Sequence, residues 1–392
     1  MEKRTLPKGI LSIQFLILLI YASLSLLVLL PLYFKEIGGS PSQIGFFIGI
    51  FSLASFLSRP FIGWLLDRKD PRKIFILGNF LFLISVSLYP LIKSMSLSLT
   101  FLRIFHGFSF SMTILAALLM AIFLSKEEVR AYALGIISIA FMLPQLIMPM
   151  LGEKIIEDYG FSIYFGLTIA LVFISFLLSF NLKFKIIRET IPGKKTKFTE
   201  ILRRRKTLLL LPLSFLVGFG VSSSFTFVPL LTAEESLLRA GFFFTFSALT
   251  AVFVRAFLGK RLSWWGKPVV LFPCFILFSL SIFLLFLSKN NYFLSLTGLL
   301  FGLSLGFLYP NLMALNVERI MAQERGKVLS LFASSVDLGF ALGPFIFGWL
   351  TDLTGIRTTF LIYSIIILVF SLSINFFLWP EFSKNHLKVD LP

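Results

Sequence analysis

Asp337, Arg103 and His106 are ionisable side chains that stand inside long apolar stretches of the chain, where they could hold a charge or move a proton. Asp337 lies near the middle of the apolar run 328–350, and a charge at that depth costs roughly 2.5–3.5 kcal/mol on insertion scales. Desolvation favours the neutral acid, which is the form that a proton carrier needs before it releases its proton. The alternative for Asp337 is a fixed hydrogen bond or ion pair between helices.

Arg103 and His106 are three residues apart, so they share one face of a helix. A lipid-facing arginine would be expensive, and we therefore expect this face to line a cavity and to contact an anion or a proton. Two alternatives stay open. Arg103 could bond to a backbone carbonyl of another helix, and His106 could be a hydrogen-bonded packing residue.

Uncharged polar side chains in the same kind of stretch could line that cavity. They are Tyr21, Gln145, Tyr309, Asn311 and Asn316. The alternative for each is an ordinary hydrogen bond between helices, worth about 0.6 kcal/mol.

Composition places the chain in a membrane. Hydrophobic residues make up 57% of its 392 residues and the mean hydropathy is +0.93, whereas ordinary soluble domains are about 45–50% apolar. The formal net charge of +17 does not indicate nucleic-acid binding, because the basic residues stand between apolar runs. With one cysteine, Cys274, and two histidines, we expect no disulfide framework, no metal site and no cofactor.

Motifs of enzymes and ATPases give no stronger interpretation. The sequence holds no H-E-x-x-H and no Walker A pattern. Gly302-Leu-Ser304-Leu-Gly306 matches the hydrolase pattern G-x-S-x-G, but it lies within an apolar span, and a nucleophile elbow needs a strand-to-helix turn. We therefore expect no enzyme, and a lipid-handling or other non-transport membrane protein is the more distant alternative.

The elements that must position these residues are membrane helices. A hydrocarbon core of roughly 30 Å needs about 20 apolar residues for each crossing, and twelve such segments are bounded by charged or turn-rich breaks. They are Ile10–Phe34, Gln43–Leu66, Ile74–Ile92, Leu97–Leu124, Ala131–Leu151, Phe161–Phe180, Leu208–Leu231, Ala240–Leu258, Val269–Leu287, Tyr292–Val317, Val328–Leu350 and Thr358–Trp379.

The distribution of Lys and Arg predicts the orientation. Alternate connections, counted with both termini, hold 27 of the 36 basic residues on the side of the termini and 6 on the other. By the positive-inside rule, both termini are predicted to be cytoplasmic. The long basic segment 183–206 then links an amino-terminal part, 1–182, to a carboxy-terminal part, 207–380, followed by a cytoplasmic tail, 381–392.

The two parts resemble each other at an offset of 195 or 196 residues. The matching pairs are Gly45-Phe46-Phe47 with Gly241-Phe242-Phe243, Arg59-x-Phe61-x-Gly63 with Arg255-x-Phe257-x-Gly259, Gly107-x-Ser109 with Gly302-x-Ser304, Pro149 with Pro344, and Gly160 with Gly355. A duplicated six-helix unit explains this order of matches. Arg59 and Arg255 occupy equivalent places near the cytoplasmic surface, where we expect gate or structural roles.

Two motifs resemble the major facilitator superfamily. After the second predicted span, the sequence that starts at Gly63 reads G-W-L-L-D-R-K-D-P-R-K, similar to the family's loop signature G-x-x-x-D-R-x-G-R-R. Asp70 and Pro71 stand where that signature has Gly and Arg, so the turn needs another geometry. Arg103-x-x-His106-Gly107 is similar to the R-x-x-x-G element of the fourth helix. The resemblance implies an all-α fold of two pseudo-symmetric six-helix bundles that work by alternating access.

The same resemblance assigns roles in a latch. Asp67, next to Arg68, would lie against the amino-terminal end of the eleventh helix, near Gly326–Val328, where the helix dipole attracts a carboxylate. Arg72 would pair with an acid after the fourth helix, either Glu127 or Glu128.

The direction of transport is indicated by part of one further pattern. Antiporters of the family carry closely spaced glycines in the fifth helix, and here Gly135, Pro149 and Gly152 match while Pro144, Met148 and Glu153 replace glycines. The resemblance thus favours proton-coupled efflux of a drug-like compound or metabolite by a monomer in the cytoplasmic membrane, without nucleic acid. The alternative is a proton-coupled importer or a uniporter of the same fold.

Overall fold

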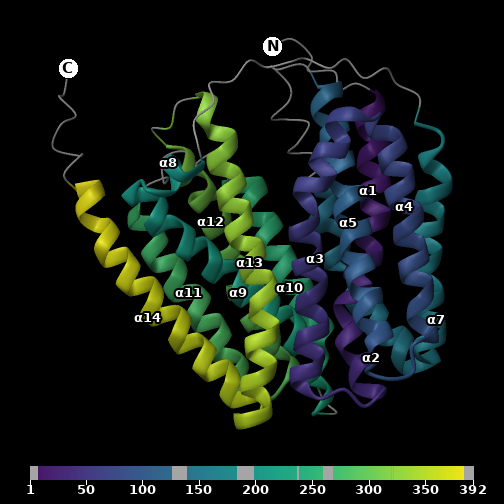
Figure 1. The fold of residues 1–392 in the computed structure, drawn as a ribbon. Helices are drawn as coiled ribbons and strands as arrows, with labels where there is room; N and C mark the ends of the chain where they lie inside the picture. Colours follow the sequence, from purple (N-terminus) through teal and green to yellow (C-terminus); the bar gives the residue numbers. More distant parts are fainter. Residues whose placement is uncertain are drawn as a thin grey trace. The chain divides into compact units, whose positions relative to one another are not determined.

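The computed structural model describes residues 8–125, 139–182, 198–235, 238–258, 268–318, 320 and 322–383 (Figure 1). Within these ranges every regular element is a helix. The chain divides into two compact units, Met1–Ile191 and Pro192–Pro392. The division falls inside the segment 183–206 that the charge pattern sets apart.

The first unit is built from long helices that pack side by side. Its elements are α1 (Lys8–Leu26), η1 (Leu27–Leu29), α2 (Leu30–Glu36), α3 (Pro41–Arg68), α4 (Pro71–Leu88), η2 (Tyr89–Leu91), α5 (Leu97–Leu124), η3 (Leu143–Leu146) and α7 (Met148–Ser179). Helix α5 packs against α3 and α4, and α7 packs against α1 and α4. Helix α5 therefore has neighbours on two sides, which buries the face that carries Arg103 and His106.

The second unit is built in the same way. Its elements are α8 (Phe198–Leu202), α9 (Arg205–Ala233), α10 (Ala240–Phe253), the π-helical turn η4 (Val254–Leu258), α11 (Pro268–Leu287), α12 (Asn291–Val317), α13 (Ala322–Thr354) and α14 (Ile356–Ser383). The main pairs are α9 with α13, α10 with α12, and α11 with α12 and α14 (Figure 1).

By length and composition, nine helices in the described ranges are apolar enough to cross a membrane. One of them, Ile139–Ser179, holds the predicted sixth span and the described part of the fifth. These two are divided at Gly160, whose φ of 75° is not helical. The predicted eighth and ninth spans lie on the shorter apolar helices Ala240–Phe253 and Leu271–Leu287.

Several predicted ends differ from the observed helix ends, and two differences from the prediction have a clear physical reason. The eleventh helix, α13, begins at Ala322 and not at Val328, because hydropathy locates the part of a helix in hydrocarbon and misses polar turns beyond it. The first span is not one α-helix either. The 3₁₀ turn Leu27–Leu29 interrupts it just before Pro31, which has no backbone N–H for a continuous helix.

The sequence repeat has counterparts in the contacts of each unit. A Cβ on Gly107 would overlap the backbone of Phe51, and a Cβ on Gly302 would overlap the backbone of Ser247, the residue equivalent to Phe51. Gly160 and Gly355 both have positive φ, 75° and 82°, at equivalent turns. The matched glycines are thus kept where the same helices approach closely or where the same turn is made.

Candidate functional site

A buried cation joins three elements of the first unit. Arg103, on α5, is 3% exposed, and its Nε donates to the carbonyl oxygen of Phe47 on α3 at 2.7 Å. Its Nη1 donates to the hydroxyl of Tyr89, in η2, at 2.8 Å, and its guanidinium lies 4.6 Å from the ring centre of Phe51. The hydrogen bond to Phe47 is the bond to a backbone carbonyl of another helix that was given as the alternative to a cavity role.

His106 belongs to the same cluster. Its side chain is 1% exposed, and its Nδ1 lies 2.7 Å from the Tyr89 hydroxyl and 3.4 Å from Arg103 Nη1. The rings of Phe51 and Phe82 lie 4.7 and 4.9 Å from the imidazole. Its Nε2 is buried and has no hydrogen-bond partner among the described residues. Tyr89 was missed by the sequence reasoning, because it lies in the third predicted span and no spacing connects it to the fourth.

The second unit has no counterpart of this cluster. Gly298 stands at the position equivalent to Arg103, and a Cβ there would overlap the carbonyl oxygen of Phe243, the residue equivalent to Phe47. Phe301 is equivalent to His106. At this position, the Arg103 side chain of the first unit therefore joins α5 to α3. In the second unit, Gly298 lets the backbones of α12 and α10 make direct contact.

The loop between α3 and α4 has a turn geometry of its own. Asp70, at the position of a family glycine, is the N-cap of α4, and its Oδ1 accepts from the Arg72 backbone N–H at 2.9 Å. Pro71 takes the first helical position, where its missing N–H costs nothing. The Arg72 guanidinium also donates to Asp70 Oδ2, from Nε at 3.2 Å and from Nη2 at 2.8 Å, and these bonds hold the pKa of Asp70 below its ordinary value.

The other members of the loop signature lie on the surface. Asp67 and Arg68 are exposed, and the Arg68 guanidinium stacks over the ring of Trp64 at 4.3 Å. A Cβ on Gly63 would meet nothing within 4 Å. Glu127 and Glu128, the predicted partners of Arg72, lie outside the described residues.

Asp337 is half-buried on α13, the helix that packs against α9. Ser335 Oγ donates to the carbonyl oxygen of Leu211 on α9 at 2.6 Å. A Cβ on Gly339 would lie 2.6 Å from the Phe219 backbone nitrogen. A carboxyl group is thus placed on a helix whose backbone lies directly against α9.

Of the polar residues of α12, two asparagines donate hydrogen bonds within their own helix and one tyrosine packs against an aromatic ring. Asn311 and Asn316 are buried and donate to their own helix, to the carbonyl oxygens of Phe307 and Leu312 at 2.9 and 2.8 Å. Tyr309 packs against Phe332, with ring centres 5.2 Å apart.

The structure brings Tyr309 together with Arg255, although the two residues were predicted to have separate roles. Arg255 is half-buried in the π-helical turn Val254–Leu258, within electrostatic range of Tyr309. Its counterpart Arg59 is half-buried in continuous α-helix, directly before Pro60. Single π turns are frequent at functional sites.

The remaining predicted cavity residues, Tyr21 and Gln145, lie on α1 and on η3, which packs against α1. Tyr21 is half-buried and its ring lies 4.5 Å from that of Phe141 and 6.1 Å from that of Phe110. Gln145 is half-buried in η3, which packs against α1.

Ion pairs between distant residues were also missed. Arg204 donates to both carboxylate oxygens of Glu324 at 2.8 and 3.0 Å, so the acid in the first turn of α13 already has a cation. Lys206 pairs with Glu318 at 3.3 Å. Arg357 pairs with Glu235 and donates to the carbonyl oxygens of Phe286 and Ser288, both at 2.8 Å.

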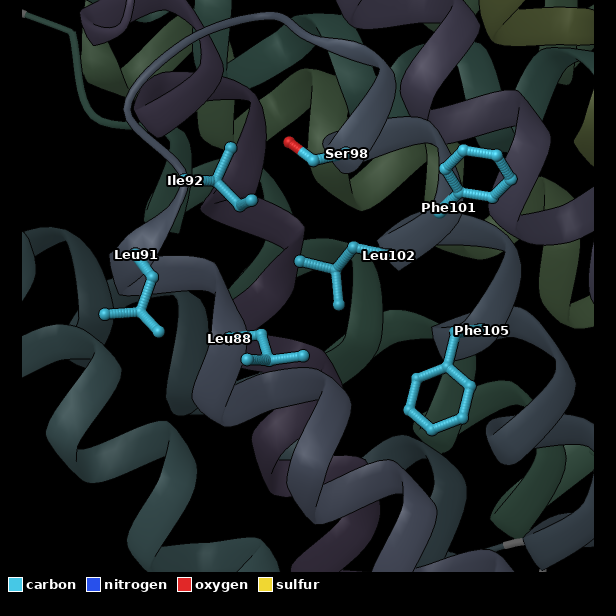
Figure 2. A pocket seen from close by; sticks show the side chains of 7 residues that line it. All are labelled: Leu88, Leu91, Ile92, Ser98, Phe101, Leu102 and Phe105. Atoms are coloured by element: carbon cyan, nitrogen blue, oxygen red, sulfur yellow. The ribbon is translucent and has the colours of Figure 1, made fainter.

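An apolar hollow of about 390 Å³ lies where α4 and η2 meet the start of α5 (Figure 2). It is lined by Leu88, Leu91, Ile92, Ser98, Phe101, Leu102 and Phe105. Figure 2 shows the Ser98 hydroxyl as the single polar side-chain group among them. With no charged lining residue, this hollow is unsuited to proton chemistry and contains none of the predicted site residues.

Comparison with known proteins covers nearly the whole chain. The family model described as Major Facilitator Superfamily matches residues 10–273 and 240–390. The Staphylopine export protein of Staphylococcus aureus (strain Mu50 / ATCC 700699) is 24% identical, over 87% of this chain and 89% of its own. The Quinolone resistance protein NorA of Staphylococcus aureus (strain COL) is 24% identical, over 88% and 90%. The crystal structure of the nucleoside transporter NupG has a TM-score of 0.79 at 12% identity, covering 94% of this chain and 98% of that one.

Proposed function

Because this chain belongs to the major facilitator superfamily, and is therefore a multi-pass membrane transporter and not an enzyme, we propose that it exports a small molecule in exchange for protons. Similarity over most of the length to an export protein and to a quinolone resistance protein supports the direction. The incomplete glycine pattern of the fifth helix supports the second candidate, an importer or uniporter of the same fold.

We further propose that the fold has twelve spans in two six-helix bundles that alternate access to a central site. The two compact units, the matched glycine contacts and the kink at Gly160 support this arrangement. Tyr21 and Gln145 in the first unit, and Tyr309, Asn311 and Asn316 in the second, are the candidate lining residues. Both termini are predicted to be cytoplasmic, and in export the cargo enters the central site from inside the cell.

Asp337 is the proposed carrier of the coupling proton. Its support is its depth: it lies well inside α13, half-buried, where an ionised carboxylate is costly and protonation removes that cost. Inverted vesicles with an acidic lumen should accumulate a quinolone such as norfloxacin, or the dye ethidium. Asp337→Asn should reduce accumulation to the level of vesicles without the protein.

The matched control is Asp352→Asn, an exposed acid on the same helix, which should retain accumulation. If Asp337→Asn keeps the pH dependence of the natural protein, Asp337 is not the carrier. Accumulation driven by an alkaline lumen would instead indicate import.

Asp67 is the proposed latch residue of the loop signature. Its carboxylate lies on the exposed end of α3, and Arg72 pairs with Asp70 in the adjacent turn. Asp67→Asn should slow transport and leave membrane insertion unchanged, measured as initial accumulation rate per amount of inserted protein. A rate equal to that of the natural protein would exclude the latch.

A further inference from the structure

The Tyr89 hydroxyl lies between the two basic side chains of the buried cluster in the first unit. It accepts a hydrogen bond from Arg103 Nη1 at 2.8 Å and lies 2.7 Å from His106 Nδ1. A guanidinium has only donors, so the direction of the first bond is fixed. The hydroxyl proton of Tyr89 is then available for His106.

The contacts of Nδ1 select one form of the imidazole. If Nδ1 is unprotonated, it accepts the Tyr89 proton, and the bridge is complete. If Nδ1 carries the proton, the Tyr89 O–H has no acceptor in the part of the chain that the structure describes. The Nδ1–H would also face Arg103 Nη1 at 3.4 Å, donor against donor. Either tautomer leaves one buried donor without an acceptor among the described residues, Nε2–H in one and the Tyr89 O–H in the other, so the two donors that face Nδ1 decide, and the proton belongs on Nε2.

The doubly protonated form is disfavoured by the groups around the ring. Helix α5 contributes the Arg103 guanidinium and η2 contributes the Tyr89 hydroxyl. Helices α3 and α4 contribute the aromatic rings of Phe51 and Phe82. Among the described residues, Arg103 is the charged group next to the ring, with Nη1 3.4 Å from Nδ1, and it repels a second positive charge.

We propose that Tyr89 is a positioning residue that holds His106 as the neutral Nε2–H tautomer, so that Arg103 is the fixed charge of this cluster. This arrangement leaves fewer candidates for the carrier of the coupling proton, an inference that rests on the proposed function. The coupling proton is carried by a carboxyl group such as Asp337, and His106 does not relay it.

Nitrogen NMR of ¹⁵N-histidine-labelled protein tests the tautomer directly. The chain has two histidines, so His386→Gln leaves His106 as the single source of signal. We expect one protonated nitrogen, Nε2, and one unprotonated nitrogen, Nδ1, at every pH from about 5 to 8, the range in which an ordinary histidine titrates. A ring that is protonated on Nδ1, or that titrates within this range, would overturn the proposal.

Removal of the bridging hydroxyl tests the role of Tyr89. Tyr89→Phe should shift the His106 signals towards a mixture of the two tautomers. Tyr33→Phe is the matched control in the same unit, because its hydroxyl donates to the carbonyl oxygen of Ile92 at 2.6 Å. It should leave the His106 spectrum unchanged. An unchanged spectrum in Tyr89→Phe as well would show that Tyr89 does not set the tautomer. These spectra do not depend on transport, so they separate this proposal from failure of the proposed export.

Discussion

Residue by residue, several buried polar groups of the first unit bind defined partners on other elements. Arg103 donates to Phe47 on α3 and to Tyr89 in η2. Asn79 on α4 donates to Ser175 on α7 at 2.9 Å. Tyr164 on α7 donates to the carbonyl oxygen of Leu26 on α1 at 2.7 Å. Each bond joins a different pair of elements, so together they fix how the helices of this unit are rotated against one another.

The charged turn gives a prediction about pH. Arg72 lowers the pKa of Asp70 below its unfolded value of about 3.9, so the ion pair stabilises the folded chain above that value. This contribution is lost as the pH falls through the lower folded pKa. Asp70→Asn should therefore lower the thermal unfolding midpoint in detergent at pH 6, and the difference from the natural protein should vanish in acid.

The cap itself is separable from the ion pair. Asn is as good an N-cap as Asp, whereas Ala provides no cap, at a cost of about 0.5–2 kcal/mol. Asp70→Ala should therefore remain less stable than Asp70→Asn even in acid. If the two variants unfold alike at every pH, the hydrogen bond from the Arg72 backbone to Asp70 does not contribute.

At the scale of the elements, close helix contacts depend on residues without side chains. Gly107 and Gly302 lie where α5 crosses α3 and where α12 crosses α10. On α13, Gly339 and Gly343 meet the backbone of α9 around Phe219. The eleventh-helix position of the repeat thus has the close packing that small residues permit in membranes.

A single methyl group should disturb such a crossing. In Gly302→Ala the new Cβ would lie 2.7 Å from the carbonyl carbon of Ser247 and 2.9 Å from its Cα, and backbone atoms cannot rotate away. We expect the unfolding free energy to fall by about 1–3 kcal/mol, the usual cost of overpacking. The unfolding midpoint in detergent measures this loss.

Gly166→Ala on α7 is the control for helix propensity, because its Cβ would meet nothing within 4 Å. It should be neutral or stabilising by about 0.5–1 kcal/mol. Equal midpoints for the two alanine variants would contradict the close approach of α10 and α12.

At the scale of the whole molecule, the charge asymmetry predicts which connections face the cytoplasm. Lys69 follows α3 on the predicted cytoplasmic side, and Lys289 follows α11 on the opposite side, and both are exposed. In a Cys274→Ala background, a membrane-impermeant maleimide should label Lys289→Cys in intact cells. Lys69→Cys should be labelled only after the membrane is opened. The reverse pattern would invert the predicted topology.

The sequence alone was sufficient for the family and for most helix positions. Hydrophobicity is a local property, so a run of apolar residues predicts a membrane helix without knowledge of its neighbours. The predicted span Leu97–Leu124 coincides with α5. The Asp70 cap could also be predicted from the sequence, because Asp before Pro71 is a helix-start signal. Asp70 was considered only as a departure from the family's loop signature.

Only the tertiary structure decided the partners of the polar side chains. Helical spacing placed Arg103 and His106 on one face but could not predict Tyr89, because that contact depends on how α5 is rotated against η2. Arg204 and Glu324 are 120 residues apart and meet through the packing of their unit. A membrane helix is specified by its own residues, whereas a buried hydrogen bond is specified by the rotation and register of two helices, which no single segment contains.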